Sequence, residues 1–461
     1  VSAAIYLCLR WYIPSLKLYW FHFAHLFCAL YLVILVHKGV TVALSLFGAS
    51  GVVIPKSDLD ALDPSTLPVY TVLVPMYREK EVASRILKHV TALDYPRDKL
   101  DVIFLLEGDD PETQAACDAA DLPPYIRKLV IPHTLPKTKP KACNVGLKEA
   151  KGEFLVIYDA EDRPEPDQLK KAVCAFRKAD PSTICFQAKL NYYNPDQNLL
   201  TKWFTIEYTM WFDLYLPGLH RMGAPIPLGG TSNHFRTAPL QAVGGWDPFN
   251  VAEDCDLGIR LTRKGYRTEM LDSTTWEEAT SKLRIWIRQR SRWVKGYIQT
   301  HLVHTRKPFR TLKELGPLGM LHFLVTVGGL SLTLILNPLF WLSGLAWLYF
   351  RWQMWYDESL LSQVFFILTI ILGAGNAIFI GMNLLACTRR GYRRYLFHAL
   401  LSPIYWVLIS VGAWKGFIQF LTHPFYWEKT RHGFASPPPD SDGTPPVAKI
   451  EPPPATSPSG S

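Results

Sequence analysis

Two patterns of hydrophobic positions divide the chain. Between residues 69 and 280, short apolar runs at 69–75, 101–107, 153–160 and 182–188 alternate with stretches of helical periodicity, such as 80–90 and 166–179. Such alternation is typical of βαβ units, in which helices cover a mainly parallel sheet. The pattern therefore predicts an α/β domain with a doubly wound sheet over residues 66–280.

Long apolar segments flank this domain. Residues 18–54 suffice for one bilayer crossing plus a further apolar helix, or for two short crossings, and they lack a signal-peptide cleavage site. Apolar segments return at about 316–350, 361–386 and 396–422. We therefore predict the following parts: a membrane anchor over 1–55, interfacial helices over 281–312, transmembrane helices over 313–427, and a disordered Pro-rich tail over 428–461.

Composition supports a membrane protein with one soluble part, because 49% of the residues are hydrophobic and only 19% are charged. The net charge of +9 does not point to nucleic acid, since many basic residues flank apolar segments, as expected of cytoplasmic loops. The eight cysteines form no CxxC pair, which favours a reduced cytosolic face over disulfides or zinc. We expect an inner (plasma) membrane protein of several crossings with a cytosolic catalytic domain.

Acidic residues follow several of the predicted strands. In an open α/β sheet, ligands bind at the carboxyl ends of the strands. One acidic turn would mean little, because Asp and Glu are ordinary turn residues, but here they recur after successive apolar runs. In the stretch YDAEDRP, Asp159 and Glu161 have the i, i+2 spacing that lets two carboxylates share a divalent cation, with Asp162 as a second candidate. The alternative is a capped turn before the helix near residue 166.

Other polar groups suit phosphate binding and proton transfer. Lys139 and Lys141 precede a helix and suit phosphate oxygens, although lysine-rich loops usually face solvent. Glu253, Asp254 and Asp256 begin another helix, where the helix dipole alone would favour them. The functional interpretation is that one of them is the general base. Between these motifs, Gly229 and Gly230 allow close approach of a ligand to the backbone, and Thr231 and Ser232 add hydroxyl groups.

The stretch QRSRW lies beside the first long apolar segment after the domain. If residues 283–299 are helical, Gln289, Arg292 and Trp293 share one face and Arg290 points elsewhere. An indole ring can stack on a sugar, and a guanidinium group can clamp a phosphate. The alternative is an interfacial helix in which Trp286 and Trp293 only anchor at lipid headgroups.

The order of these motifs resembles the D, DxD, TED and QxxRW series of family 2 processive glycosyltransferases, the cellulose-synthase-like group. The resemblance implies a GT-A fold, a UDP-sugar donor and Mg²⁺ or Mn²⁺. It assigns Asp159 and Glu161 to the metal, Asp254 to the catalytic base, Lys141 to the diphosphate, and Gln289, Arg292 and Trp293 to the QxxRW element. Together with the residue chemistry, we expect Glu253 to join Asp254 in catalysis. We expect the donor to contact Asp159, Lys141, Gln289 and Arg292, and the acceptor to contact Trp293, Gly230 and Thr231.

The stretch VPMYRE resembles the nucleotide-binding segment of that family, which assigns Pro75, Tyr77 and Glu79 to the donor. The chain also departs from the family pattern. The second DxD carboxylate is Glu161, Ala252 replaces the threonine of TED, and the usual DDG is replaced by LEGDDPET. Either Glu107 or Asp109 is therefore expected to contact the base and ribose.

The resemblance implies inverting, processive transfer of glucose from UDP-glucose onto a β-glucan that leaves through the enzyme's own transmembrane channel. An N-acetylglucosamine polymer synthase, a non-processive enzyme that adds one sugar to a polyprenyl phosphate, and a catalytically dead scaffold are the alternatives. The expected partners are the UDP-sugar, a glycan acceptor and the lipid bilayer, but no nucleic acid. A homo-oligomer or an export partner stays open.

Overall fold

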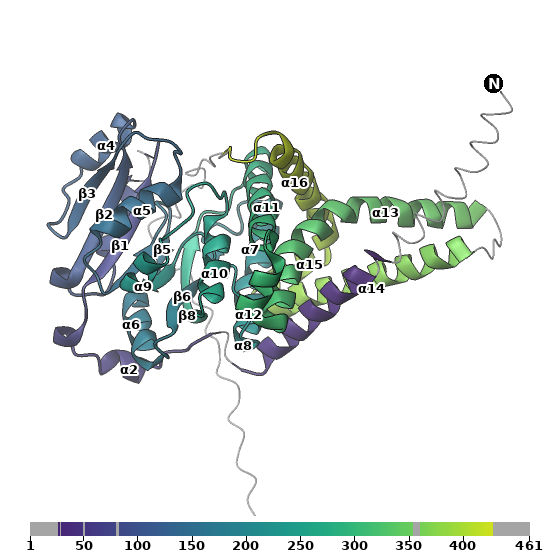
Figure 1. The fold of residues 1–461 in the computed structure, drawn as a ribbon, viewed down its shortest axis with the longest axis horizontal. Helices are drawn as coiled ribbons and strands as arrows, with labels where there is room; N and C mark the ends of the chain where they lie inside the picture. Colours follow the sequence, from purple (N-terminus) through teal and green to yellow (C-terminus); the bar gives the residue numbers. More distant parts are fainter. Residues whose placement is uncertain (1–25, 28, 49–50, 80–82, 354–359, 427–461) are drawn as a thin grey trace, which may run out of the picture.

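The computed structural model describes residues 26–27, 29–48, 51–79, 83–353 and 360–426 (Figure 1). A sheet with covering helices forms one half of the molecule, and long apolar helices form the other. The predicted Pro-rich tail lies outside the described residues.

One eight-stranded sheet with the order β3-β2-β1-β4-β7-β6-β8-β5 organises the first half. The pairs β1–β2, β1–β4, β2–β3 and β6–β8 are parallel, and the remaining three neighbouring pairs are antiparallel. The strands are β1 (Tyr70–Met76), β2 (Leu100–Glu107), β3 (Ile126–Ile131), β4 (Phe154–Ile157), β5 (Arg163–Pro164), β6 (Thr183–Tyr192), β7 (Asn233–Arg236) and β8 (Arg267–Glu277). The four apolar runs of the sequence form β1, β2, β4 and β6, so the predicted mainly parallel sheet is confirmed.

Helices cover both faces of the sheet. Successive side chains of a strand point to opposite faces, so Val72 and Val74 of β1 pack with α3 and α6 while Leu73 packs with α5 and α10. The helices of this half are α2 (Lys56–Asp60), α3 (Ala83–Thr91), α4 (Pro111–Asp118), α5 (Lys139–Glu149), α6 (Gln168–Lys178), α7 (Leu199–Met210), α8 (Leu216–Arg221), α9 (Thr237–Ala242) and α10 (Glu253–Arg263). A π-helical turn, η3 (Trp211–Tyr215), joins α7 to α8, and short 3-10 turns lie at η1 (Pro64–Thr66), η2 (Arg97–Lys99) and η5 (Arg393–Tyr395).

Among the described residues, four helices are long and apolar enough to cross a membrane: Ala29–Leu46, Pro308–Leu339, Thr369–Arg389 and Ser402–Thr422. Three of these spans lie wholly within the predicted membrane segments. The boundary expected at residue 312 falls inside the second span, which begins at Pro308. The elements of this half are α11 (Leu283–Thr305), α12 (Pro308–Phe323), η4 (Leu324–Gly329), α13 (Leu330–Gln353), α14 (Leu360–Arg389), α15 (Leu396–Leu400) and α16 (Ser402–Thr422). Figure 1 shows α13 and α14 extending together from the body of the molecule.

Helix α11, which carries QRSRW, packs closely against α16. A Cβ atom at Gly416 would lie 2.5 Å from the carbonyl oxygen of Ser291, so only glycine permits this approach. The close contact joins the predicted interfacial helix to the membrane helices.

Candidate active site

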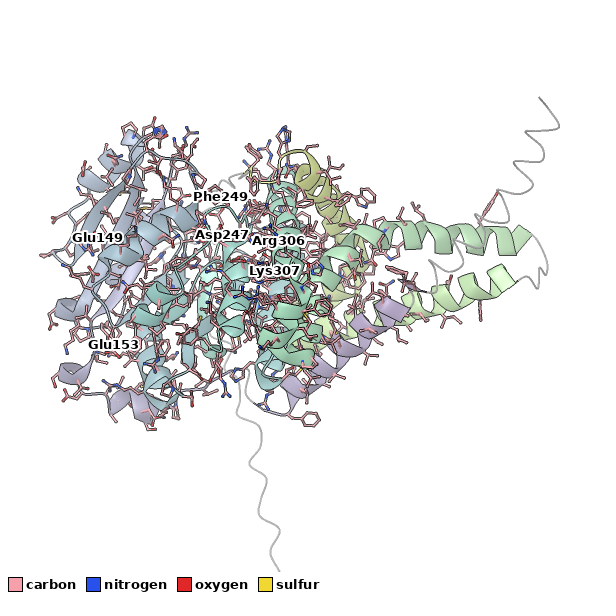
Figure 2. All side chains as sticks on the ribbon, in the orientation of Figure 1. Glu149, Glu153, Asp247, Phe249, Arg306 and Lys307 are labelled. Atoms are coloured by element: carbon pink, nitrogen blue, oxygen red, sulfur yellow. The ribbon has the colours of Figure 1, made fainter. Side chains whose placement is uncertain are left out.

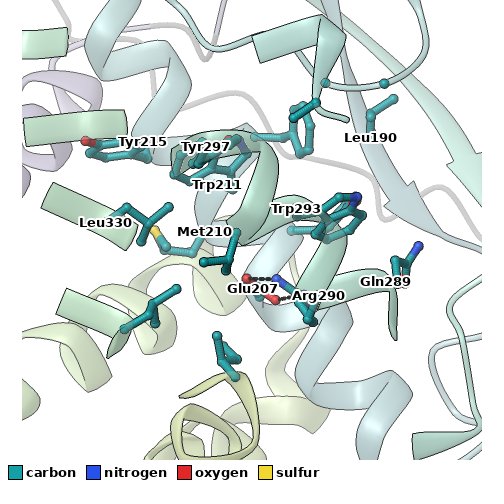
Figure 3. Close-up of a pocket in the computed structure, with 18 of the residues that line it drawn as sticks. Leu190, Glu207, Met210, Trp211, Tyr215, Gln289, Arg290, Trp293, Tyr297 and Leu330 are labelled. Carbon is teal, nitrogen blue, oxygen red and sulfur yellow. Dashed lines mark hydrogen bonds and ion pairs between the residues drawn. The ribbon is translucent and has the colours of Figure 1, made fainter. Parts of the chain in front are cut away.

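One cavity of about 350 Å³ connects the carboxyl edge of the sheet with the membrane helices. Figure 3 shows part of its wall, where α11 faces α7. The described residues that line the sheet end include Lys139, Asp159, Glu161, Gly229, Gly230, Thr231, Glu253, Asp254, Glu277, Glu278, Gln289, Arg292 and Trp293. The lining continues into the membrane helices through Ser331, Asn337, Asn376, Asn383, Ser402 and Trp406. The structure therefore gathers the predicted metal, base and QxxRW residues around a single space.

The loop after β4 presents Asp159 and Glu161 to this cavity. Asp162 does not line it. Its fully buried carboxylate accepts hydrogen bonds from the backbone amide of Asp159 at 2.8 Å and from the Thr231 hydroxyl. Burial, followed by the charges of Asp159 and Glu161, raises the pKa of Asp162 well above its ordinary value. Asp162 thus holds the turn that presents Asp159 and Glu161, whereas the helix α6 that follows has no side-chain cap.

Two lysines of α5 have different surroundings. The ammonium group of Lys139 forms an ion pair with Asp159 and donates to the carbonyl oxygen of Gly230 at 2.8 Å. Burial opposes the charged form of Lys139, but the carboxylates of Asp159 and Glu253 outweigh it and raise its pKa. Lys141 lies outside the cavity lining and donates to the carbonyl oxygen of Thr134 at 2.9 Å, beside Glu107. Two residues apart on a helix, these side chains point to opposite sides.

The first turn of α10 places Glu253 and Asp254 in the cavity wall. One carboxylate oxygen of Asp254 accepts from the amide of Cys255 at 2.7 Å. Burial raises the pKa of Asp254, although Lys139 and Arg292 counteract it. Burial and then the charge of Asp254 raise the pKa of Glu253 to about 7. A carboxylate whose pKa lies nearer neutrality is a better general base at physiological pH.

Helix α11 brings the QxxRW residues to the same place. A Cβ atom at Gly296 would lie 2.6 Å from the backbone nitrogen of Ala252, so glycine allows α11 to touch the start of α10. Gln289, Arg292 and Trp293 all line the cavity, as the helical spacing predicted. Arg292 is close enough to lower the pKa values of both Glu253 and Asp254, which places a cation beside the acidic pair.

Arg290 also lines the cavity, although the helical spacing placed it away from the face of Gln289, Arg292 and Trp293, and it has a partner that the sequence did not reveal. Its guanidinium group forms two hydrogen bonds with the carboxylate of Glu207 on α7, one of them at 2.6 Å, and one with the Tyr405 hydroxyl at 3.0 Å (Figure 3). It also lies 4.7 Å from the centre of the Trp293 ring. Arg290 thereby ties α7, α11 and α16 together and supports Trp293.

Trp286 is fully buried in the described structure, with its ring 5.2 Å from that of Tyr405. It packs between helices, so it does not serve as an anchor at lipid headgroups. Trp293 is only partly buried and faces the cavity.

The residues predicted to bind the nucleotide occupy the neighbouring strand ends, outside the cavity lining. Pro75 and Met76 end β1, and Glu107 ends β2. Because β2, β1 and β4 are adjacent and parallel, these strand ends lie at the same edge of the sheet as Asp159, which follows β4. The amide of Glu79 donates to the Thr113 hydroxyl at 3.0 Å. At the same edge, Tyr77 stacks against Arg78, and Asp109 forms an ion pair with Lys137.

Glu277 and Glu278, at the end of β8, also line the cavity and were not predicted. The sequence could have identified them, because they follow a run rich in β-branched residues, just as the other acidic residues follow their strands. Burial, followed by the charges of Asp162, Asp159 and Glu161, raises the pKa of Glu277 well above its ordinary value. The carboxylates therefore crowd one another, and the site has an excess of negative charge.

This excess fits a divalent cation. Within the described residues, no three His, Cys, Asp or Glu side chains converge at metal-binding distance. The cavity offers the two carboxylates of Asp159 and Glu161, of which Asp159 is paired with Lys139. Mg²⁺ is commonly bound by one or two carboxylates together with substrate phosphates. The residues present fit a metal that binds together with a diphosphate.

Comparisons with known proteins agree with this geometry. Residues 68–296 match the model of the family described as "Glycosyltransferase like family 2". The chain is 29% identical over 233 residues to "Probable glycosyltransferase YdaM" of Bacillus subtilis, covering 50% of this chain and 55% of that protein. It is 27% identical over 250 residues to "Glucomannan 4-beta-mannosyltransferase 2" of Arabidopsis thaliana, covering 52% and 47%. The chain thus spans about half the length of these curated relatives.

Among solved structures, a mannosyltransferase from Pyrobaculum calidifontis in complex with GDP-Man and Mn²⁺ shares the fold. The TM-score is 0.52 at 19% identity, over 86% of this chain and 98% of that chain. The GT-A fold expected from the sequence is confirmed. Residues 68–296 of this chain are therefore similar to family 2 glycosyltransferases.

Proposed function

We propose that the chain is a processive, inverting glycosyltransferase that extends a β-glycan and passes it into its membrane helices. The continuous cavity carries this proposal, because acidic and cationic groups at the sheet end share one space with Asn337, Asn376 and Asn383 of the membrane helices. A site for a single small acceptor would not need to continue along α13, α14 and α16.

The residues of the sheet end fit one direct displacement. Asp254 accepts the proton of the acceptor hydroxyl while that oxygen forms a bond to the anomeric carbon of the donor. The bond between this carbon and the diphosphate breaks, and the nucleoside diphosphate leaves with its electron pair. Lys139 and Arg292, which line the same cavity, would balance the charge of the departing phosphates. A divalent ion held by Asp159 and Glu161 would neutralise further charge on the diphosphate.

The remainder of the cavity suits a sugar chain. Trp293 presents an aromatic surface next to the acidic pair, and Trp211 and Trp406 offer further rings along the lining. Apolar faces of sugar rings stack on indoles, and the asparagines supply hydrogen bonds to hydroxyl groups. The terminal sugar would rest on Trp293 with its hydroxyl directed at Asp254.

The proposed donor is UDP-glucose, which yields a β-glucan. GDP-mannose is the alternative donor to compare with UDP-glucose, because some relatives are named as mannosyltransferases. We place the catalytic domain on the cytosolic side, where nucleotide sugars are made. The basic stretch 388–395 then faces the same side, as the ion pair between Arg390 and Asp213 requires.

The test uses the full chain in lipid nanodiscs with radiolabelled UDP-glucose, UDP-N-acetylglucosamine or GDP-mannose, and Asp254→Asn as the inactive control. The expected result is a polymer from UDP-glucose whose linkage analysis gives a β-glucan. If a polymer forms from another donor instead, the proposed donor sugar is wrong but the proposed mechanism stands. A single glycolipid product would refute processivity, and no product from any donor would refute the function.

A further inference from the structure

A second cavity, of about 230 Å³, lies where α11 ends and α12 begins. Figure 2 labels Arg306 and Lys307 at this junction, on the side of the sheet-bearing half. The residues that line it are Arg263, Val303, His304, Arg306, Lys307, Arg310 and Thr311. Four of these seven side chains are cationic and none is acidic, so an anion is the ligand that this cavity fits.

The charges around the cavity are not balanced by the protein. Glu314 pairs with both Arg263, at 2.6 Å, and Arg310, at 2.8 Å. Neither Arg306 nor Lys307 has an ion-pair partner in the part of the chain that the structure describes. The cavity also adjoins the first turn of α12, which runs as a helix from Pro308 to a kink at Gly316 and whose amino-terminal end carries partial positive charge.

The inner wall is ordered by hydrogen bonds. His304 is 1% exposed, and its Nδ1 accepts from Arg263 at 2.7 Å, since a guanidinium group can only donate. Its Nε2–H therefore donates to Asp256, at 3.0 Å. The Thr311 hydroxyl donates to the carbonyl oxygen of His304 at 2.6 Å. The site is thus built from buried polar groups in addition to exposed cations.

Exposed apolar side chains around the cavity indicate that the anion comes from a membrane surface. Phe309 is 85% exposed, and Leu302, Val303 and Leu312 are exposed as well. The second candidate membrane span begins at Pro308, directly beside the cavity. Exposed aromatic and aliphatic residues among Lys and Arg are typical of segments that lie at the headgroup level.

We propose that this basic cavity binds the phosphate of an anionic phospholipid in the leaflet that faces the glycosyltransferase domain. The cations Arg306 and Lys307 would contact the phosphate, and Phe309 and Val303 would pack against the acyl chains. The bound lipid neutralises the unpaired cations and stabilises the junction of α11 with α12.

The cavity is connected to the helix that carries the predicted base. Arg263 and Asp256 belong to α10, and His304 bridges them, so the wall of the cavity and Asp254 share one helix. Lipid binding at the far end should hold the first turn of α10 in place. This part of the inference rests on the proposed function, and it predicts faster sugar transfer in anionic membranes.

The binding test does not depend on activity. Short-chain phosphatidylglycerol is titrated into the purified full chain in neutral detergent, and the midpoint of thermal unfolding is followed, since a ligand of the native state raises it. Phosphatidylcholine of the same chain length and inorganic phosphate are titrated in parallel. Arg306→Ala combined with Lys307→Ala is the test variant, and Lys148→Ala with Lys151→Ala, on the sheet-bearing half, is the matched charge control.

The expected result is a rise of the unfolding midpoint with phosphatidylglycerol only. The apparent affinity should weaken about 25-fold in the test variant, from a roughly fivefold contribution of each cation at an anionic surface, and stay unchanged in the control. An equal effect of phosphatidylcholine, an unchanged affinity in the test variant, or an equal effect of inorganic phosphate would each overturn a lipid site. If binding behaves as expected but no sugar donor is used, the proposed function fails and the lipid site stands.

Discussion

Replacing each of two tryptophans on α11 by alanine should impair a different property of the protein. Trp286 is fully buried against Phe204 and Tyr405, whereas Trp293 faces the cavity with the Arg290 guanidinium beside its ring. Trp286→Ala should therefore impair folding, and Trp293→Ala should impair polymer synthesis.

The magnitudes follow from burial. Removing a fully buried Trp side chain costs about 3–5 kcal/mol of stability, because the lost packing leaves a cavity. Trp293 is partly exposed, so Trp293→Ala should cost roughly 1–2 kcal/mol by the loss of buried apolar area. Its larger effect should be on the rate, because a misplacement of about 1 Å at the acceptor hydroxyl can cost on the order of a hundredfold.

The assay compares thermal unfolding, UDP affinity and polymer yield for both variants in the same detergent. For Trp293→Ala we expect near-normal UDP affinity with polymer yield about a hundredfold lower, and Trp293→Phe should recover part of it. Polymer synthesis within about threefold of the parent would refute the acceptor platform. So would a loss of UDP affinity that matches the loss of polymer.

Four further outcomes are expected. Asp254→Asn should abolish transfer while UDP binding persists, and transfer retained within about tenfold, roughly 1.4 kcal/mol of barrier, would contradict the general-base role. Because the pKa of Glu253 is raised to about 7 beside Asp254, the pair takes up protons as the pH falls through neutrality, so kcat/KM should decrease about tenfold per pH unit below it; a flat profile from pH 5 to 8 would refute this. Glu207→Ala should destabilise the chain by about 3 kcal/mol, because it leaves Arg290 buried without its carboxylate, and the additional change Arg290→Met should recover part of the loss if the pair is coupled. EDTA should abolish transfer and Mg²⁺ or Mn²⁺ should restore it, whereas activity indifferent to EDTA would remove the metal from the mechanism.

The sequence alone determined the features that depend on local periodicity. Strands β1, β2, β4 and β6 were visible as apolar runs because a strand buried on both faces is apolar throughout. Asp159, Glu161 and Asp254 could be chosen because strand ends and helix starts are local features. The shared face of Gln289, Arg292 and Trp293 followed from the helical repeat.

The tertiary structure decided what depends on partners far along the chain. Nothing near Arg290 in sequence indicates Glu207, which is 83 residues away and meets it only because α7 packs on α11. Lys139 and Lys141 are equivalent as residues, and only the orientation of α5 turns Lys139 toward the cavity. Trp286 and Trp293 likewise look alike in sequence, but close packing with α7 and α16 buries only Trp286 completely. A linear pattern shows which face of an element is apolar, whereas the neighbour that covers that face is fixed only when the elements pack together.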